Sequence, residues 1–160
     1  MPRMPRISLE GALYYITSRG NHEQEIFNDH KDYHTYLELL EKYKKEYGFK
    51  LFSYVLLPNH LHLLIEIKQG TTISEVMHAL NSSYTKYFNL KYNRQGHVLQ
   101  GRYKFNLLEK EPYLLYMTAY IHHNSVVLGL CKEIGEYKYS SYSAYVQELS
   151  KINLHQEVGE

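Results

Sequence analysis

Two apolar runs separated by only two residues constrain the fold more than any other feature of this chain. The runs are FKLFSYVLL at 49–57 and HLHLLIEI at 60–67, and Pro58 and Asn59 lie between them. Proline and asparagine are typical of tight turns. Two β-prone runs with so short a connection pair as an antiparallel hairpin. The sequence therefore predicts a hairpin in an antiparallel sheet, which other segments must extend and cover.

The remaining segments alternate between strand and helix patterns. We expect strands at 12–18, 49–57, 60–67 and 102–109 and helices at 30–47, 73–92 and 112–127, with a short helix or turn near 140–148. Thr72 and Glu75 form a capping box for the second helix, and Pro112 suits the first position of the third. The order β-α-β-β-α-β followed by a helix predicts an α+β fold of the ferredoxin-like, split βαβ type. Its antiparallel sheet is expected to carry the helices on one face.

Length and composition are those of a globular protein. The chain has 160 residues, 44% of them hydrophobic and 22% charged. We expect one domain over 1–150 and a tail over 151–160. No stretch has the apolar length of a membrane helix, the N-terminus lacks the apolar core of a secretory signal, and a cytoplasmic location fits. A single cysteine, Cys131, excludes an internal disulfide framework and a cysteine-based zinc site.

Positive charge is concentrated in one segment. The net charge is +1, but residues 81–110 contain six basic side chains and one acidic one. Such a segment is either a phosphate-binding face or a solvated helix and loop. Arg3 and Arg6 add charge to the N-terminal arm.

Two histidines interrupt the apolar run at 60–67. Side chains alternate along a strand, so His60 and His62 stand on one face and Leu61 and Leu63 on the other. Neighbouring imidazoles can chelate a metal ion. Roughly 0.6 His-x-His triplets arise by chance in a chain of this composition, so the motif alone is weak evidence. A metal site and a hydrogen-bonded structural pair both remain open.

The third expected helix offers further polar groups. Tyr120 and Asn124 are four residues apart and share a helical face. Tyr113 and Tyr116 continue this stripe, and we expect them to pack on the sheet. His122 and His123 turn away from Tyr120 and are expected to be surface or structural residues.

Several motifs together resemble the single-tyrosine HUH transposases of small bacterial insertion sequences, and most closely the REP-associated tyrosine transposases. The motifs are YYITSRGNHEQEIF at 14–27, VLLPNHLHLL at 55–64, GHVLQGRYK at 96–104, YIHHNSVVLGL at 120–130 and YKYSSYSAY at 137–145. The chain departs from the family pattern at Ser125, where proline is common. It also departs at Leu99, Tyr137 and Tyr139, where tryptophan is common.

The resemblance implies a metal-dependent enzyme that cleaves and rejoins single-stranded, hairpin-forming DNA. Tyr120 matches the nucleophile, which forms a 5′-phosphotyrosine bond. His60 and His62, with Asn124 as third ligand, match the metal site. Mg²⁺ or Mn²⁺ is favoured, and Zn²⁺ remains an alternative because imidazole suits it. No general base for Tyr120 is evident, and a homodimer is one of two assemblies that the family implies.

Candidate DNA contacts come from the basic segment and the first strand. They are Arg94, Arg102, Lys104, Tyr103 and Arg19. Cationic side chains contact phosphates, and tyrosine rings stack on bases. Two other functions stay open: a non-catalytic module that binds single-stranded nucleic acid, and a metal phosphodiesterase that uses water as the nucleophile.

Overall fold

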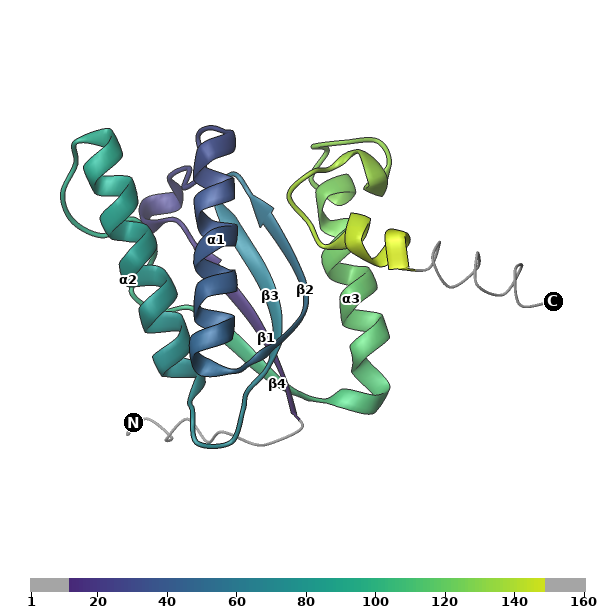
Figure 1. The fold of residues 1–160 in the computed structure, drawn as a ribbon. Helices are drawn as coiled ribbons and strands as arrows, with labels where there is room; N and C mark the ends of the chain where they lie inside the picture. The colour runs from purple at the N-terminus through teal and green to yellow at the C-terminus, as the bar shows by residue number, and fades with distance from the viewer. Residues whose placement is uncertain (1–11, 149–160) are drawn as a thin grey trace.

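The computed structural model describes residues 12–148 and contains a four-stranded sheet with three long helices (Figure 1). The elements are β1 (Ala12–Arg19), α1 (His30–Tyr47), β2 (Lys50–Leu57), β3 (His60–Glu66), α2 (Ile73–Tyr92), β4 (Lys104–Glu109) and α3 (Lys110–Val127), with 3₁₀ turns at Asn21–Glu23 and Ile134–Glu136. Residues 142–148 are helical. Arg3, Arg6 and the expected tail lie outside the described residues. None of the helices within 12–148 is long and apolar enough to cross a membrane.

The sheet has the strand order β2-β3-β1-β4, and every neighbouring pair is antiparallel. The predicted hairpin is present, with Leu57 opposite His60 across the turn. The order of elements and strands confirms the α+β, ferredoxin-like fold. β3 occupies a central position, so its side chains are covered on both faces of the sheet and all seven of its residues are buried.

Local signals set the ends of α1 and α2 where the sequence places them. The Asp29 side chain accepts a hydrogen bond from the Asp32 backbone at the start of α1, and Gly48 ends it with φ 71°. Both hydrogen bonds of the capping box at Thr72 and Glu75 are present. α3 begins at Lys110, so Pro112 is its third residue and not its first. Proline is tolerated there because the first four amides of a helix have no partner within it.

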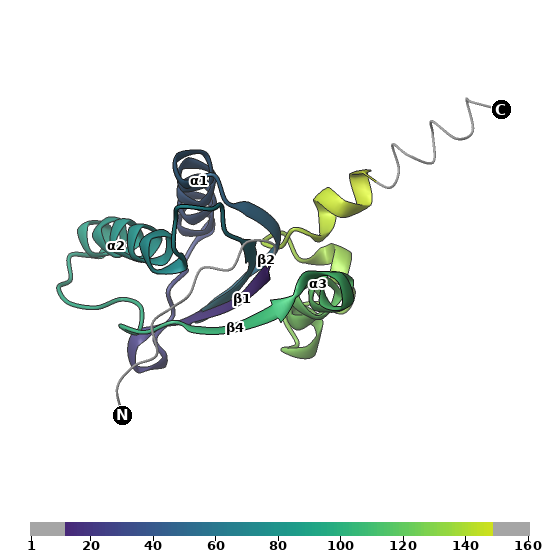
Figure 2. The same ribbon diagram turned by 90° about the horizontal axis from the view of Figure 1, so that it is seen from below.

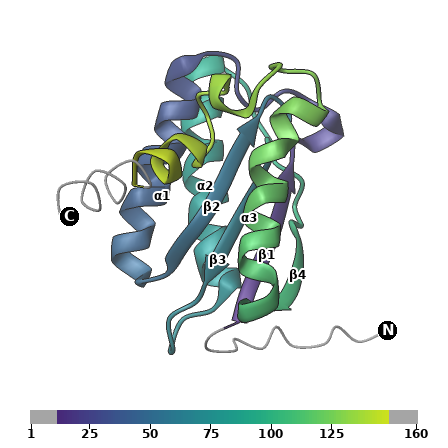
Figure 3. The same ribbon diagram turned by 90° about the vertical axis from the view of Figure 1, so that its right-hand side faces the viewer.

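The helices divide between the two faces of the sheet (Figure 2). α1 and α2 lie together on one face and cover the larger apolar core, which includes Leu61, Leu63 and Ile65. α3 lies across the opposite face (Figure 3). Ile121 of α3 belongs to a second apolar cluster there that includes Leu64. Placement of the helices on one face therefore holds for α1 and α2 but not for α3. The consequence is that the face of β3 that carries its histidines looks toward α3.

The buried stripe of α3 differs from the expected one. Tyr113 and Tyr116 are 43% and 66% exposed, so the expectation that they pack on the sheet was wrong. The helix buries Ile121 together with the small residues Thr118 and Ser125. Small side chains allow a close approach to the strands. The tyrosines therefore face away from the sheet.

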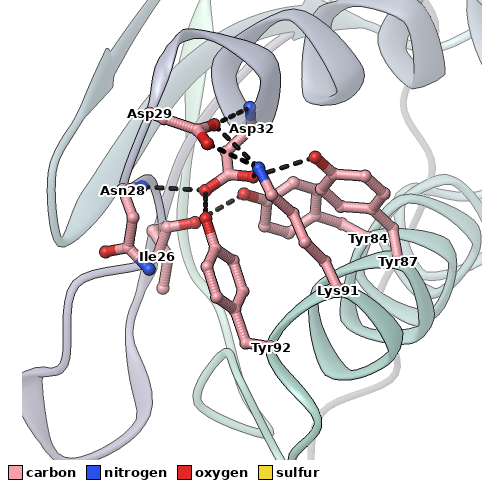
Figure 4. Close-up of polar contacts among 8 residues, drawn as sticks. All are labelled: Ile26, Asn28, Asp29, Asp32, Tyr84, Tyr87, Lys91 and Tyr92. Carbon is pink, nitrogen blue, oxygen red and sulfur yellow. Dashed lines mark hydrogen bonds and ion pairs between the residues drawn. The ribbon is translucent and has the colours of Figure 1, made fainter.

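A buried carboxylate joins the start of α1 to the end of α2 (Figure 4). Asp32 is 0% exposed and accepts hydrogen bonds from the Tyr87 and Tyr92 hydroxyls, at 2.9 and 2.5 Å. Lys91 Nζ lies 2.8 Å from Asp32 Oδ1, and the Asn28 amide donates to Oδ2 at 2.9 Å. Burial by itself would raise the pKa of Asp32, but these donors together hold it below its ordinary value. We call this group the Asp32 cluster.

Candidate active site

The paired imidazoles lie at the end of β3, on the face that α3 covers. His60 and His62 are 7% and 5% exposed. Their ring centroids are 5.0 Å apart and the ring planes are nearly perpendicular. Arg19 lies opposite His60 on β1, and Thr17 lies opposite His62. The pairing therefore surrounds both rings with side chains from β1.

Hydrogen bonds occupy the Nδ1 atom of each ring. His60 Nδ1 lies 2.7 Å from Asn59 Oδ1, which can only accept, so Nδ1 donates and Nε2 carries the lone pair. His62 Nδ1 lies 2.8 Å from the Tyr15 hydroxyl and 3.1 Å from Thr17 Oγ1. Within residues 12–148, neither Nε2 atom makes a hydrogen bond. Metal-binding histidines commonly have this arrangement, with one nitrogen oriented by a neighbour and the other available to the metal.

Both histidines are neutral at physiological pH. Burial lowers the pKa of His60 to about 4, and the charge of Arg19 adds to the effect. Burial, followed by the neighbouring His60 and then Arg19, lowers the pKa of His62 to about 3. Metal ligation requires the neutral imidazole. The site is therefore prepared for a cation without the loss of a proton.

Tyr120 lies on α3 and reaches the histidine face through an intermediate ring. It is 52% exposed, and its ring meets the edge of Tyr15 at a centroid distance of 6.3 Å. Tyr15 in turn stacks on His62 at 5.6 Å. A continuous series of rings thus runs from His60 through His62 and Tyr15 to Tyr120. The exposed hydroxyl-bearing ring at the end of this series is accessible to a large substrate.

Tyr15 and Thr17 are site residues that the sequence interpretation missed. The alternation of β1 places them on the same face as Arg19, and pairing with β3 brings them beside His62. The signal was present in the alternation, but only the strand order makes β1 the neighbour of β3. Burial raises the pKa of Tyr15, so its hydroxyl stays neutral. The hydroxyl oxygen can accept the Nδ1–H of His62, which leaves the lone pair of His62 on Nε2.

Asn124 lies one helical turn after Tyr120 and is half-buried. It lines a hollow of about 290 Å³ together with Tyr120. Its side-chain amide makes no hydrogen bond with any other residue between 12 and 148. No group of three or more His, Cys, Asp or Glu side chains gathers within that range. Neither His60 nor His62 lines the hollow that contains Asn124. The two neutral imidazoles by themselves fit a divalent cation with open positions for phosphate oxygens.

The five candidate DNA contacts do not gather in one place. Arg19 is the member that lies beside the histidines. Arg102 and Tyr103 line a separate hollow of about 830 Å³ between α2 and the segment that precedes β4. Lys104 is exposed at the start of β4. Arg94 binds Asn89 and the His97 carbonyl after the end of α2.

The neighbouring histidines of α3 behave as expected. His122 is buried, and its Nε2 lies 2.6 Å from Ser141 Oγ. Burial lowers the pKa of His122 to about 4. His123 is exposed. His122 therefore serves to join α3 to the C-terminal segment.

The protein belongs to a class of enzymes, the DNA strand transferases and endonucleases of transposition. Residues 9–124 match the family model described as Transposase IS200 like, and the chain belongs to this family. None of the curated protein sequences is significantly similar to it.

One solved structure has the same fold. It is described as a REP-associated tyrosine transposase bound to a REP hairpin, and it superposes with a TM-score of 0.75 and 19% identity, over 92% of this chain and 86% of that chain. Another, from Deinococcus radiodurans R1, has a TM-score of 0.48 and 13% identity over 75% of this chain and 96% of that chain, too low to support an argument.

Proposed function

We propose that this transposase cleaves and rejoins single-stranded DNA through a covalent bond between Tyr120 and a 5′-phosphate. The observation that supports the proposal is the series of rings from His62 through Tyr15 to Tyr120, at 5.6 and 6.3 Å. It links Tyr120, the proposed nucleophile, to His62, one of the two proposed metal ligands. Phosphodiester chemistry requires both a nucleophile and compensation of the phosphate charge.

The chemistry is a transfer between two esters. The Tyr120 oxygen attacks phosphorus, the phenolic proton leaves, and the 3′-oxygen of the preceding nucleotide departs as a 3′-hydroxyl. The new phosphotyrosine bond conserves the energy of the broken phosphodiester. A 3′-hydroxyl from a second strand can then attack the same phosphorus and release Tyr120. Rejoining therefore needs no ATP.

The residues that would hold a metal are His60, His62 and Asn124. A bound Mg²⁺ or Mn²⁺, with Zn²⁺ as the alternative, supplies positive charge at the phosphoryl oxygens. Asn59 orients the ring of His60, while Tyr15 and Thr17 orient that of His62. Arg19 adds a fixed positive charge on the same face.

The substrate we propose is a single strand that carries a hairpin. The structural neighbour described as bound to a REP hairpin supports this choice by analogy of fold. We propose that the five candidate side chains contact the phosphates and bases of this strand, and Arg19 is the nearest of them to the histidines. The active protein is either a monomer or a homodimer, and both assemblies are compatible with this proposal.

A covalent adduct tests the proposal directly. The protein is incubated with hairpin-bearing single-stranded DNA, labelled at either end, and Mn²⁺ or Mg²⁺. The expected product is a protein–DNA adduct that survives SDS and contains only the label 3′ of the cut. The released fragment should be extended by a polymerase because it ends in a 3′-hydroxyl. Tight binding without an adduct in either metal would favour the non-catalytic module.

The affinity of the site for a metal ion is expected to be nearly the same at pH 7.5 and pH 5.5. The pKa values of about 4 and 3 for His60 and His62 keep both rings neutral at pH 5.5. Calorimetry with Mn²⁺ should therefore give affinities at pH 7.5 and pH 5.5 that agree within about 2-fold, whereas two imidazoles with ordinary pKa values would lose about 100-fold. A loss of that size would contradict the buried arrangement.

The lowered pKa values of His60 and His62 also make the stability of the fold depend on pH, so the metal titration needs a folding control. The unfolded chain binds protons with ordinary histidine pKa values, so it takes up more protons than the folded chain between pH 6.5 and about 4. The free energy of unfolding should therefore fall as pH decreases through this window. Circular dichroism at each pH verifies that the protein is folded during the metal titration.

A further inference from the structure

The outer face of α3 carries an apolar hollow beside the proposed nucleophile. It is lined by Tyr116, Ala119, Tyr120, His123, Asn124 and Val127 and measures about 290 Å³. Tyr116 is 66% exposed and Val127 is 72% exposed. Large apolar groups grouped on a solvent-facing surface commonly mark a binding site.

The size and charge of the hollow indicate its occupant. Its volume lies at the lower end of the range for small-molecule sites, which suits one flat ring system better than a protein element. None of its six lining residues is acidic. A polyanion therefore meets no like charge there, and an unpaired base can stack on a tyrosine ring.

The position of Tyr120 in the wall of the hollow indicates which base of the DNA strand would bind there. Tyr120 is a wall of the hollow, so a phosphate that Tyr120 attacks lies at its rim. The nucleotides on either side of that phosphate are the groups closest to the hollow. Tyr116 lies one helical turn before Tyr120, about 6 Å along the axis at 1.5 Å per residue.

We propose that this hollow binds the unpaired base next to the scissile phosphate, with Tyr116 as its stacking partner. The inference rests on the proposed function, because it takes the phosphate to be the one that Tyr120 attacks. Tyr116 is then a positioning residue: its ring holds the strand so that phosphorus stays near the nucleophile.

The test combines protein variants with a missing base. Binding of the single strand is measured by fluorescence anisotropy in the Tyr120→Phe background, which keeps the ring of the wall but cannot react. Tyr116→Ala should weaken binding about 5- to 150-fold, the range measured for loss of one base stack. Tyr116→Phe should stay within about 2-fold because the stacking ring remains. Leu115→Ala is the matched control, since Leu115 is 82% exposed on the same helix and lies outside the hollow.

DNA with an abasic site on either side of the scissile phosphate completes a double-mutant cycle. If the base stacks on Tyr116, Tyr116→Ala should cost less than about 2-fold on one of the two abasic strands. Equal losses on intact and both abasic strands would overturn the inference.

Two further outcomes separate the alternatives. A change in sedimentation of DNA-free Tyr116→Ala would show that a second copy of the chain covers the hollow, and this would also overturn the inference. If the wild-type protein forms no adduct, the proposed function fails. If the adduct forms but the cycle shows no coupling, the stacking inference alone fails.

Discussion

The Tyr120→Phe variant is expected to form no covalent adduct with single-stranded DNA, a loss of at least about 10³-fold in the rate of cleavage. The substitution removes the attacking oxygen and leaves the ring. Tyr120 is 52% exposed and contacts Tyr15 through its ring, so neither the fold nor this contact should change. The measurement is the rate of adduct formation on SDS gels with saturating Mn²⁺.

Tyr113→Phe is the control for this prediction. It removes a hydroxyl from another exposed tyrosine two turns earlier on the same helix, outside the hollow beside Tyr120, and it should form the adduct at the wild-type rate. An adduct that persists in Tyr120→Phe would assign the nucleophile to another residue. Cutting that continues without any adduct would favour the water-using phosphodiesterase, and His62→Ala should then stop the cutting.

The Asp32→Ala variant is expected to lose about 3–5 kcal/mol of unfolding free energy, the typical cost of removing one partner from a buried charged pair. Asp32 is completely buried and accepts hydrogen bonds from two tyrosine hydroxyls, one lysine and one backbone amide. Its removal leaves the two tyrosine hydroxyls and the Asn28 amide without this acceptor, and it leaves Lys91 paired with Asp29 alone. Urea denaturation followed by circular dichroism measures the effect.

A surface carboxylate supplies the comparison for Asp32. Glu38 pairs with His34 on the exposed side of α1, with 67% of its side chain accessible, and Glu38→Ala should change stability by less than about 1 kcal/mol. Asp32→Asn should fall between the two because the amide oxygen still accepts hydrogen bonds. If Asp32→Ala cost no more than Glu38→Ala, the Asp32 cluster would not stabilise the fold.

Elements of regular structure could be read from the sequence because their signals are local. α2 begins at Thr72, as the capping box predicts, and α1 covers the predicted range 30–47, between Asp29 and Gly48. Strand alternation also placed His60 and His62 together on one face. Each of these features depends on residues within one turn or one hairpin, where short-range geometry decides the outcome.

The surroundings of the histidines depended on contacts between distant parts of the chain. Tyr15 is 47 residues before His62, and their hydrogen bond exists because β1 pairs with β3. Tyr87 is 55 residues from Asp32, and the sequence interpretation missed this cluster. Neither pairing has a periodic signal, because the separation between partners is set by the connections and not by a helix or strand repeat.

The sequence by itself thus determined the hairpin, the order of elements and the residue types of the candidate site. The tertiary structure alone decided that α3 covers the face opposite α1 and α2, and that it buries Thr118, Ile121 and Ser125 in place of its tyrosines. The physical reason is that periodicity specifies which residues share a face of a helix. Which of those faces meets the sheet depends on the strand residues it packs against, and Ile121 completes an apolar cluster with Leu57 and Leu64.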